Sequence, residues 1–476
     1  MTGTLCQRRV ASAFLMLIWA LTALPPAALV LLVAHHWVDV PWMDEWDISD
    51  VISRYHEGTL QLKYLIAQHN EHRPLVMRSI TVVLSLINRW DLRWEMALSL
   101  FLASATFAGI ARLHYLMGGP SRLRTAVVLM VTSLVVFSPA QWANWLWGMQ
   151  FAAFIPSLFL VVGLLISVSR HSVWLKSAVN SVLACLATYS FAHGMALWVL
   201  IFPRDFINLA RRRAAKRSGW TFPLLWYAAA GVATVTLYFH DYRQAPGMPP
   251  LTHSLSHPAQ ALTYYLSWLG DPLVPDGSVF GSTARAIVGG CTLVIFVLGV
   301  VLIGRSTPYD EVSTRRPFAI RRYPWAMMGA CSLLSGAVIT IGRSGFGLDQ
   351  AAESRYVTFS LFLTVASISF APELFARWMR RGRWPLRLGT AAQTIAIMIV
   401  LLLHELAVSA SERAMSLRSD RLRQAKVALC LHRVVTDSEL LGTLYPNGSH
   451  VASAFARLKS HGQLNYDALA LPDFVR

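Results

Sequence analysis

An unusual concentration of acidic side chains follows the first apolar run of the sequence. Asp44, Glu45, Asp47 and Asp50 lie within seven positions of the stretch WMDEWDISD (42–50). The pattern fits the start of a surface helix, with Asp44 as N-cap and Asp47 near the positive helix end. It also fits catalysis, because a carboxylate fixed at a membrane surface can accept a proton from a hydroxyl group. We therefore take Asp44, Glu45 and Asp47 as candidate catalytic residues. A neighbouring acid could orient the base or bind a divalent cation, Mg²⁺ or Mn²⁺.

A second concentration of polar groups, AQHNEHRP, occupies residues 67–74. Such a segment could bind a substrate, and the candidate residues are His69, Glu71, His72 and Arg73. The alternative is contact with lipid headgroups, which is common for amphipathic side chains at a membrane surface. The two histidines do not have the spacing of the zinc-protease motif HExxH, so we assign no metal ligands to this segment.

The loop GRSGFGLDQAAESRY (342–356) carries two arginines where basic residues are otherwise scarce. A lipid phosphate is the candidate partner, because a guanidinium presents a planar fork of donors to phosphate oxygens. We expect Arg343, Arg355 and the adjacent Tyr356 to bind the phosphate of a donor. The alternative is that these arginines bind ordinary anionic headgroups or pair with acids of the same loop.

A tryptophan-rich stretch, QWANWLWGMQ, occupies residues 141–150. Indoles and amides suit stacking on a sugar ring and hydrogen bonding to its hydroxyls, which makes Trp145 and Gln150 candidate substrate-binding residues. The tryptophans equally fit the aromatic belt at a membrane interface.

Membrane-spanning helices are the elements that must position these residues. The sequence is 55% hydrophobic and 14% charged, with a mean hydropathy of +0.46, which is too apolar for a soluble protein of this size. Apolar runs near the roughly 20 residues that cross a bilayer recur, without the alternation of barrel strands. The sequence therefore predicts an all-α polytopic membrane protein. Eleven spans are expected, at about 11–34, 94–117, 125–139, 148–169, 173–190, 194–209, 219–239, 284–304, 325–342, 357–376 and 388–408.

The distribution of basic residues predicts the orientation of these spans. More than half of the 42 lysines and arginines fall in alternate short loops, which lie in the cytoplasm by the positive-inside rule. The rule holds only if a further apolar helix, at 74–90, lies along the outer surface. The N-terminus is then cytoplasmic, whereas the C-terminus and the four candidate groups are extracytoplasmic.

Two domains are expected. Residues 1–408 would form the transmembrane domain, with a first extracytoplasmic loop over about 35–93. This loop would carry surface helices at about 48–60 and 74–90. The polar, helix-prone residues 409–476 would form a small extracytoplasmic domain.

Several classes of function are disfavoured by the sequence. The net charge of +17 does not predict a nucleic-acid partner, because the basic residues follow the membrane topology. Neither a Walker A motif nor a Rossmann GxGxxG is present, and no soluble cytoplasmic region is large enough to bind a nucleotide sugar. An activated donor would therefore reach the outer face on a lipid carrier within the bilayer.

The acidic pair Asp44-Glu45 in the first outer loop, followed by surface helices, resembles the GT-C superfamily of polytopic glycosyltransferases. Members transfer sugars from polyprenyl-phosphate carriers and use a loop acid as base. The resemblance implies Asp44 as the base, with Glu45 or Asp47 in support, and Arg343 or Arg355 at the donor phosphate. The combination of DEWD, HNEHR and GR…SRY is similar to bacterial GT-C-like proteins of mostly unassigned specificity.

The expected function is therefore inverting transfer of a sugar from a polyprenyl-phosphate donor to a glycan, lipid or other acceptor hydroxyl. The expected location is a bacterial inner (plasma) membrane. The alternative is a transporter or flippase for a lipid-linked or anionic solute. Transport sites usually lie near the bilayer midplane, whereas the polar clusters here collect at one face.

Overall fold

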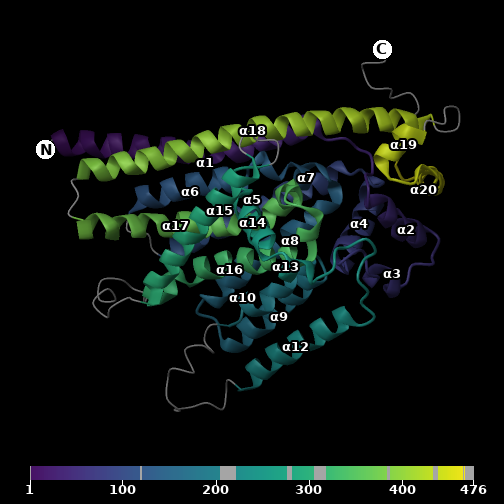
Figure 1. The fold of residues 1–476 in the computed structure, drawn as a ribbon, viewed down its shortest axis with the longest axis horizontal. Helices are drawn as coiled ribbons and strands as arrows, with labels where there is room; N and C mark the ends of the chain where they lie inside the picture. Colours follow the sequence, from purple (N-terminus) through teal and green to yellow (C-terminus); the bar gives the residue numbers. More distant parts are fainter. Residues whose placement is uncertain are drawn as a thin grey trace.

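The computed structural model describes residues 2–117, 121–203, 221–275, 281–304, 318–382, 386–431, 438–464 and 466. Within these ranges the chain forms helices joined by turns and irregular loops, with no strand and one isolated β-bridge between His69 and His72. The protein is an all-α polytopic membrane protein, as its composition predicts. Figure 1 shows long helices lying side by side and short helices gathered at one end of the bundle. We call this the polar end; it is formed by α2 (Glu45–His56), α3 (Leu62–Ile66), α4 (Leu75–Asn88), α19 (Ser438–Leu444) and α20 (Gly448–Ser460).

Nine helical segments of the described chain are long and apolar enough to cross a membrane, and they correspond to nine of the eleven predicted spans. Helices form here because a backbone in lipid must satisfy its own hydrogen bonds. Side-chain caps fix some of the starts, as where Ser121 accepts a hydrogen bond from the Arg124 backbone N–H. The segments lie in α1 (Thr2–His36), α5 (Arg93–Met117), α6 (Arg122–Val136) with the turns after it, α8 (Phe151–Ser167), α12 (Thr221–Phe239), α15 (Ser282–Gly304), α16 (Phe318–Arg343), α17 (Val357–Gly382) and α18 (Leu386–Cys430).

The remaining two predicted spans have a different form. The span expected at 173–190 is the shorter helix α9 (Val173–Thr188). Of the span expected at 194–209, the described part is a 3₁₀ turn over Ala192–Ala196 followed by α10 (Leu197–Leu200), and residues 204–209 lie outside the described ranges. The turn packs tightly on α9, because a Cβ on Gly194 would lie 2.1 Å from the Ala187 carbonyl oxygen.

Close helix packing inside the bundle depends on small residues. The helix α14 (Pro258–Gly270) crosses α15 at two glycines. A Cβ on Gly270 would lie 2.0 Å from the Arg285 carbonyl oxygen, and one on Gly289 would lie 2.0 Å from that of Leu266. The two backbones therefore approach to a distance that only glycine permits, as in other membrane helix pairs.

A hydrophobic core separate from the main core of the bundle holds the polar end together. It joins Trp46 and Ile52 of α2 to Leu429 of α18 and to Val451 and Phe455 of α20, all nearly or fully buried. The domain boundary expected at 408/409 falls inside α18, which continues unbroken to Cys430. The C-terminal helices thus share a core with the first loop.

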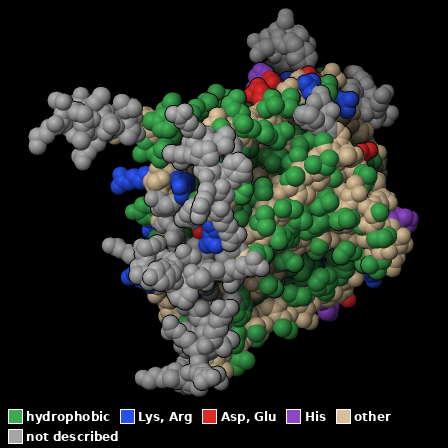
Figure 2. Space-filling view, turned by 60° about the vertical axis from the view of Figure 1, so that its left-hand side comes forward, with side chains coloured by type: hydrophobic (Ala, Val, Ile, Leu, Met, Phe, Trp, Pro, Cys, Tyr) green, Lys and Arg blue, Asp and Glu red, His purple; other side chains and the backbone are tan. Residues whose placement is uncertain are grey.

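The outer surface of the bundle is apolar. Figure 2 shows a broad face of hydrophobic side chains with charged groups near its margins. Phe101, Val232 and Val338 are each more than 60% exposed. An apolar surface of this extent is what a lipid-facing bundle presents.

Candidate active site at the polar end

Asp44 occupies the N-cap position of α2, but its side chain does not cap the helix. Its Oδ2 atom instead lies 3.2 Å from Nε2 of His69, and the side-chain amide of Asn70 donates to the same oxygen at 3.5 Å. The preceding residue, Met43, has a φ of 49°, a costly conformation for a non-glycine residue. The Met43 backbone N–H donates to the Leu444 carbonyl of α19 at 2.6 Å. Contacts from elsewhere in the chain thus orient this carboxylate.

The electrostatic surroundings of Asp44 keep it ionised. Burial acts to raise its pKa, but the hydrogen bond with His69 and the positive charges of His69 and Arg355 outweigh that effect, so the pKa lies below its ordinary value. About a third of the side chain is exposed. Asp44 is therefore a partly accessible carboxylate at neutral pH, as a proton acceptor must be.

The segment HNEH forms a tight hairpin. The backbones of His69 and His72 exchange hydrogen bonds of 2.8 and 2.9 Å, and Asn70 at the turn has a φ of 50°, which asparagine tolerates. The hairpin turns His69 toward Asp44. It turns His72 inward, where its Nδ1 accepts a hydrogen bond from the Ala192 N–H at 3.2 Å. Burial, followed by the charge of His69, lowers the pKa of His72 to about 3, so His72 is neutral.

The other two candidates of this segment have different environments. Glu71 at the tip of the hairpin forms an ion pair with Nη2 of Arg343 at 2.5 Å. The two sequence regions that were expected to share a site are thus in direct contact. Arg73, in contrast, donates to backbone carbonyls, including that of Tyr238 at 2.6 Å. Its guanidinium fixes the end of α12 beside the hairpin, which is a structural role.

A hydrogen bond fixes the backbone of Arg355, whereas its side chain forms one long ion pair. Its carbonyl accepts a hydrogen bond from the buried Asn144 amide at 3.0 Å. Its guanidinium lies 3.7 Å from Glu353 and about 5.5 Å from the ring of Tyr356. The buried Nε has no hydrogen-bond partner among the described residues. Arg355 therefore retains donors for an anion, whereas the Tyr356 hydroxyl accepts a bond from Gln350 at 3.2 Å.

The tryptophan-rich stretch serves mainly as packing in this conformation. Trp145 is fully buried, its ring stacks on Phe154, and its Nε1 donates to the Ser138 carbonyl at 3.0 Å. Gln150 is 7% exposed. Substrate contact by Trp145 or Gln150 would require the surrounding helices to separate. Asn144 of the same stretch contributes by positioning Arg355.

Glu45 is buried and faces a second acid. Its two oxygens accept backbone N–H bonds from Trp42 at 2.7 Å and from Met149 at 3.0 Å. The carboxyl of Glu95 lies opposite, since a Cβ on Gly148 would be 2.9 Å from Glu45 and 2.7 Å from Glu95. Burial and the charge of Glu95 raise the pKa of Glu45 to about 8. With both oxygens occupied, Glu45 can support the loop that carries Asp44.

Sequence reasoning missed Glu95, although an acid in the first turn of an expected span was a visible signal. Its Oε1 accepts a hydrogen bond from Thr81 at 2.9 Å, which links α5 to α4. Sequence reasoning also missed Arg418 on α18, whose guanidinium lies 4.6 Å from the ring of Trp42. The cluster of basic residues in the expected C-terminal domain gave no indication of that contact.

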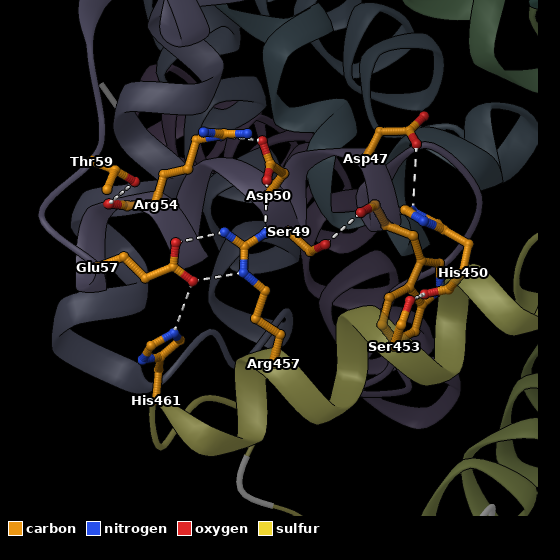
Figure 3. Close-up of polar contacts among 11 residues, drawn as sticks. Asp47, Ser49, Asp50, Arg54, Glu57, Thr59, His450, Ser453, Arg457 and His461 are labelled. Carbon is orange, nitrogen blue, oxygen red and sulfur yellow. Dashed lines mark hydrogen bonds and ion pairs between the residues drawn. The ribbon is translucent and has the colours of Figure 1, made fainter.

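Asp47 connects the site to the C-terminal helices (Figure 3). Its Oδ1 accepts a hydrogen bond from the Tyr445 hydroxyl at 3.1 Å and lies 3.8 Å from Nε2 of His450. Further along, Arg457 of α20 binds Asp50 of α2 at 2.8 Å and both oxygens of Glu57, which caps the C-terminal end of α2, at 2.7 Å. Charge complementarity and the shared core thus place α20 along α2.

Asp44, Asp47 and His69 form a group that could hold a cation. One ligand atom from each lies within 4.8 Å of the others. Two carboxylates and an imidazole nitrogen at a partly exposed site suit Mn²⁺, since nitrogen ligands favour it over Mg²⁺. From the sequence we expected only that an acid next to the base could bind a divalent cation, and we assigned no metal ligand to His69.

No protein-family model matches the chain, and neither a curated protein nor a solved structure is significantly similar to it.

Proposed function

We propose that the protein is an inverting glycosyltransferase that moves a sugar from a polyprenyl-phosphate carrier to an acceptor hydroxyl. One observation carries the proposal: the hairpin of residues 69–72 contacts Asp44 through His69 at 3.2 Å and Arg343 through Glu71 at 2.5 Å, which brings the acidic segment and the distant arginine loop together. A carboxylate to accept a proton and a guanidinium to receive a phosphate are the two groups that such a transfer requires. The resemblance of the sequence to GT-C enzymes points the same way.

The proposed reaction is a single displacement. Asp44 accepts the proton of the acceptor hydroxyl while the hydroxyl oxygen bonds to the anomeric carbon of the sugar. The bond from that carbon to the phosphate oxygen breaks, and its electron pair stays on the polyprenyl phosphate. Arg355 would stabilise the phosphate as its charge develops, because its guanidinium retains free donors. Arg343, which is paired with Glu71, would add positive charge near the same phosphate.

The proposed location is the extracytoplasmic face of a bacterial inner membrane, because the basic loops of the sequence favour that orientation. The acceptor would be a cell-envelope glycan or lipid. A divalent cation held by Asp44, Asp47 and His69 would add positive charge near the donor phosphate. We propose Mn²⁺ or Mg²⁺ as this optional cofactor.

Replacement of the base tests the proposal. The purified protein would be supplied with a panel of radiolabelled polyprenyl-phosphate sugars, and release of polyprenyl phosphate would be measured. Asp44→Asn is expected to lower the rate by at least about 100-fold, which is the usual contribution of a general base. Asp349→Asn is the matched control, since this acid is exposed. Full activity of Asp44→Asn would refute the assignment.

The phosphate ligand requires a separate measurement. Arg355→Ala is expected to raise the KM for the donor more than that for the acceptor, because only the donor carries phosphate. Arg243→Ala removes an exposed arginine and serves as the control. Equal and small effects on both substrates would identify Arg355 as a headgroup-binding residue.

A further inference from the structure

A cavity of about 1000 Å³ lies beside α18 at the polar end. Trp42 and Trp142 line one side, Arg418 and Arg421 of α18 line another, and Gly442 of α19 contributes a third. The volume is at the upper end of the range of roughly 300–1,000 Å³ that ligand pockets occupy. Neither Asp44 nor Arg355 is among its lining residues, but Met43, which precedes Asp44, is, so the cavity adjoins the candidate active site.

Neither arginine forms an ion pair with a carboxylate within the described chain, although the charge of the nearby Glu45 acts on Arg418. Arg418 donates from Nη1 to the Leu146 carbonyl at 2.9 Å and lies over the Trp42 ring, but its buried Nε has no hydrogen-bond partner. Asp420, the acid nearest to both in sequence, pairs instead with Arg423 at 3.0 Å. Two adjacent guanidiniums that face one cavity without a carboxylate between them favour an anionic ligand.

The position of the cavity along α18 indicates which kind of anion it would meet. The apolar span of α1 ends at His36, and Nδ1 of His36 lies 3.4 Å from Oγ of Ser419 on α18. Arg418 and Arg421 therefore lie just past the membrane, at the level of the lipid headgroups. Leu417, which also lines the cavity, is 62% exposed, and indoles such as Trp42 are typical of this level.

We propose that this cavity binds the phosphate headgroup of a membrane lipid, with Arg418 and Arg421 as the phosphate ligands. The indoles of Trp42 and Trp142 would contact the part of the lipid next to the phosphate. The proposal does not depend on sugar transfer, because it concerns a second site with its own ligands. It explains why Arg418 keeps a buried Nε donor without a hydrogen-bond partner at the membrane surface.

Binding of dodecyl phosphate tests the proposal. The full chain in a neutral detergent would be titrated with this probe, and the apparent Tm would give a Kd. Arg421→Gln is expected to raise the Kd about tenfold, because a charge-assisted hydrogen bond contributes at least that much. Adding Arg418→Gln should raise it roughly a further tenfold. Arg413→Gln on the same helix is the matched control, because Arg413 does not line the cavity.

A second variant guards against misfolding of the arginine variants. A Cβ on Gly442 would meet no atom within 4 Å, so Gly442→Leu is expected to project a side chain into the cavity without disturbing the fold. It should weaken binding and leave the Tm without ligand unchanged. Unaltered binding in both Arg421→Gln and Gly442→Leu would overturn the proposal.

Two further ligands identify the source of the phosphate. Inorganic phosphate is expected to raise the Tm far less than dodecyl phosphate at equal concentration, and dodecanol is expected to have no saturable effect. Equal binding of inorganic phosphate would identify a free-anion site and overturn the lipid assignment. Equal binding of dodecanol would show that the arginines do not select the ligand.

Discussion

Phe455 attaches the C-terminal helices to α2 through a side chain that is 1% exposed. It packs in the core shared with Trp46 and Ile52, and its ring stacks on Tyr466 at a centroid distance of 5.8 Å. Phe455→Ala would remove this contact and leave a cavity. Truncation of a fully buried phenylalanine costs about 3–5 kcal/mol. At about 1.4 kcal/mol per factor of ten, the undocked state of α20 should become about 100- to 4000-fold more populated.

Hydrogen exchange measures that population directly. We expect the backbone amides of α20 to lose about 100-fold of their protection in Phe455→Ala, while those of the membrane helices keep theirs. Phe101→Ala is the matched control, because Phe101 is 66% exposed on α5. Transfer activity should fall in parallel, since Asp47 loses its contacts with Tyr445 and His450. Wild-type exchange of α20 in folded Phe455→Ala would refute the shared core as the cause of docking.

Three other outcomes are expected. Gly148→Ala places a methyl group between the carboxyls of Glu45 and Glu95, so the apparent Tm should fall by an amount equivalent to about 1–3 kcal/mol; an unchanged Tm would contradict the packing described. Hydrogen bonding from Arg457 lowers the pKa of Glu57 to about 2 from 4.5, so this contact stabilises docking above pH 4.5 and is lost as the pH falls toward 2. The protection factors of the α20 amides, which are corrected for the intrinsic slowing of exchange in acid, should therefore fall on acidification, and fall less in Arg457→Gln. His69→Gln should raise the Kd for Mn²⁺ by at least about tenfold in an electron paramagnetic resonance titration, and an equal Kd would exclude His69 as a ligand.

The membrane architecture could be predicted because it is encoded locally. An apolar run of the right length becomes a helix wherever it lies in the chain, and nine segments follow that rule. The surface helices expected at 48–60 and 74–90 also formed, as Glu45–His56 and Leu75–Asn88. Residues 173–203 were harder to predict, since their hydropathy did not reveal the tight return of the chain at Gly194.

The arrangement of the site could be predicted only in part, because its contacts span long sequence separations. Glu71 and Arg343 meet across 272 residues, and hydropathy carries no signal for such a pair. Trp145 illustrates a different limit: an indole fits a sugar site, a membrane interface or a core equally well, and only tertiary packing distinguishes them.

The length of α18 has a mechanical consequence. Its 45 residues contain no proline and extend about 68 Å, more than twice the thickness of the hydrocarbon layer. If the helix stays straight, a tilt of about 10° about one end would displace the other end by about 12 Å. Membrane helices adjust their tilt to bilayer thickness. The depth at which Arg418 meets the headgroups is therefore coupled to the thickness of the surrounding membrane.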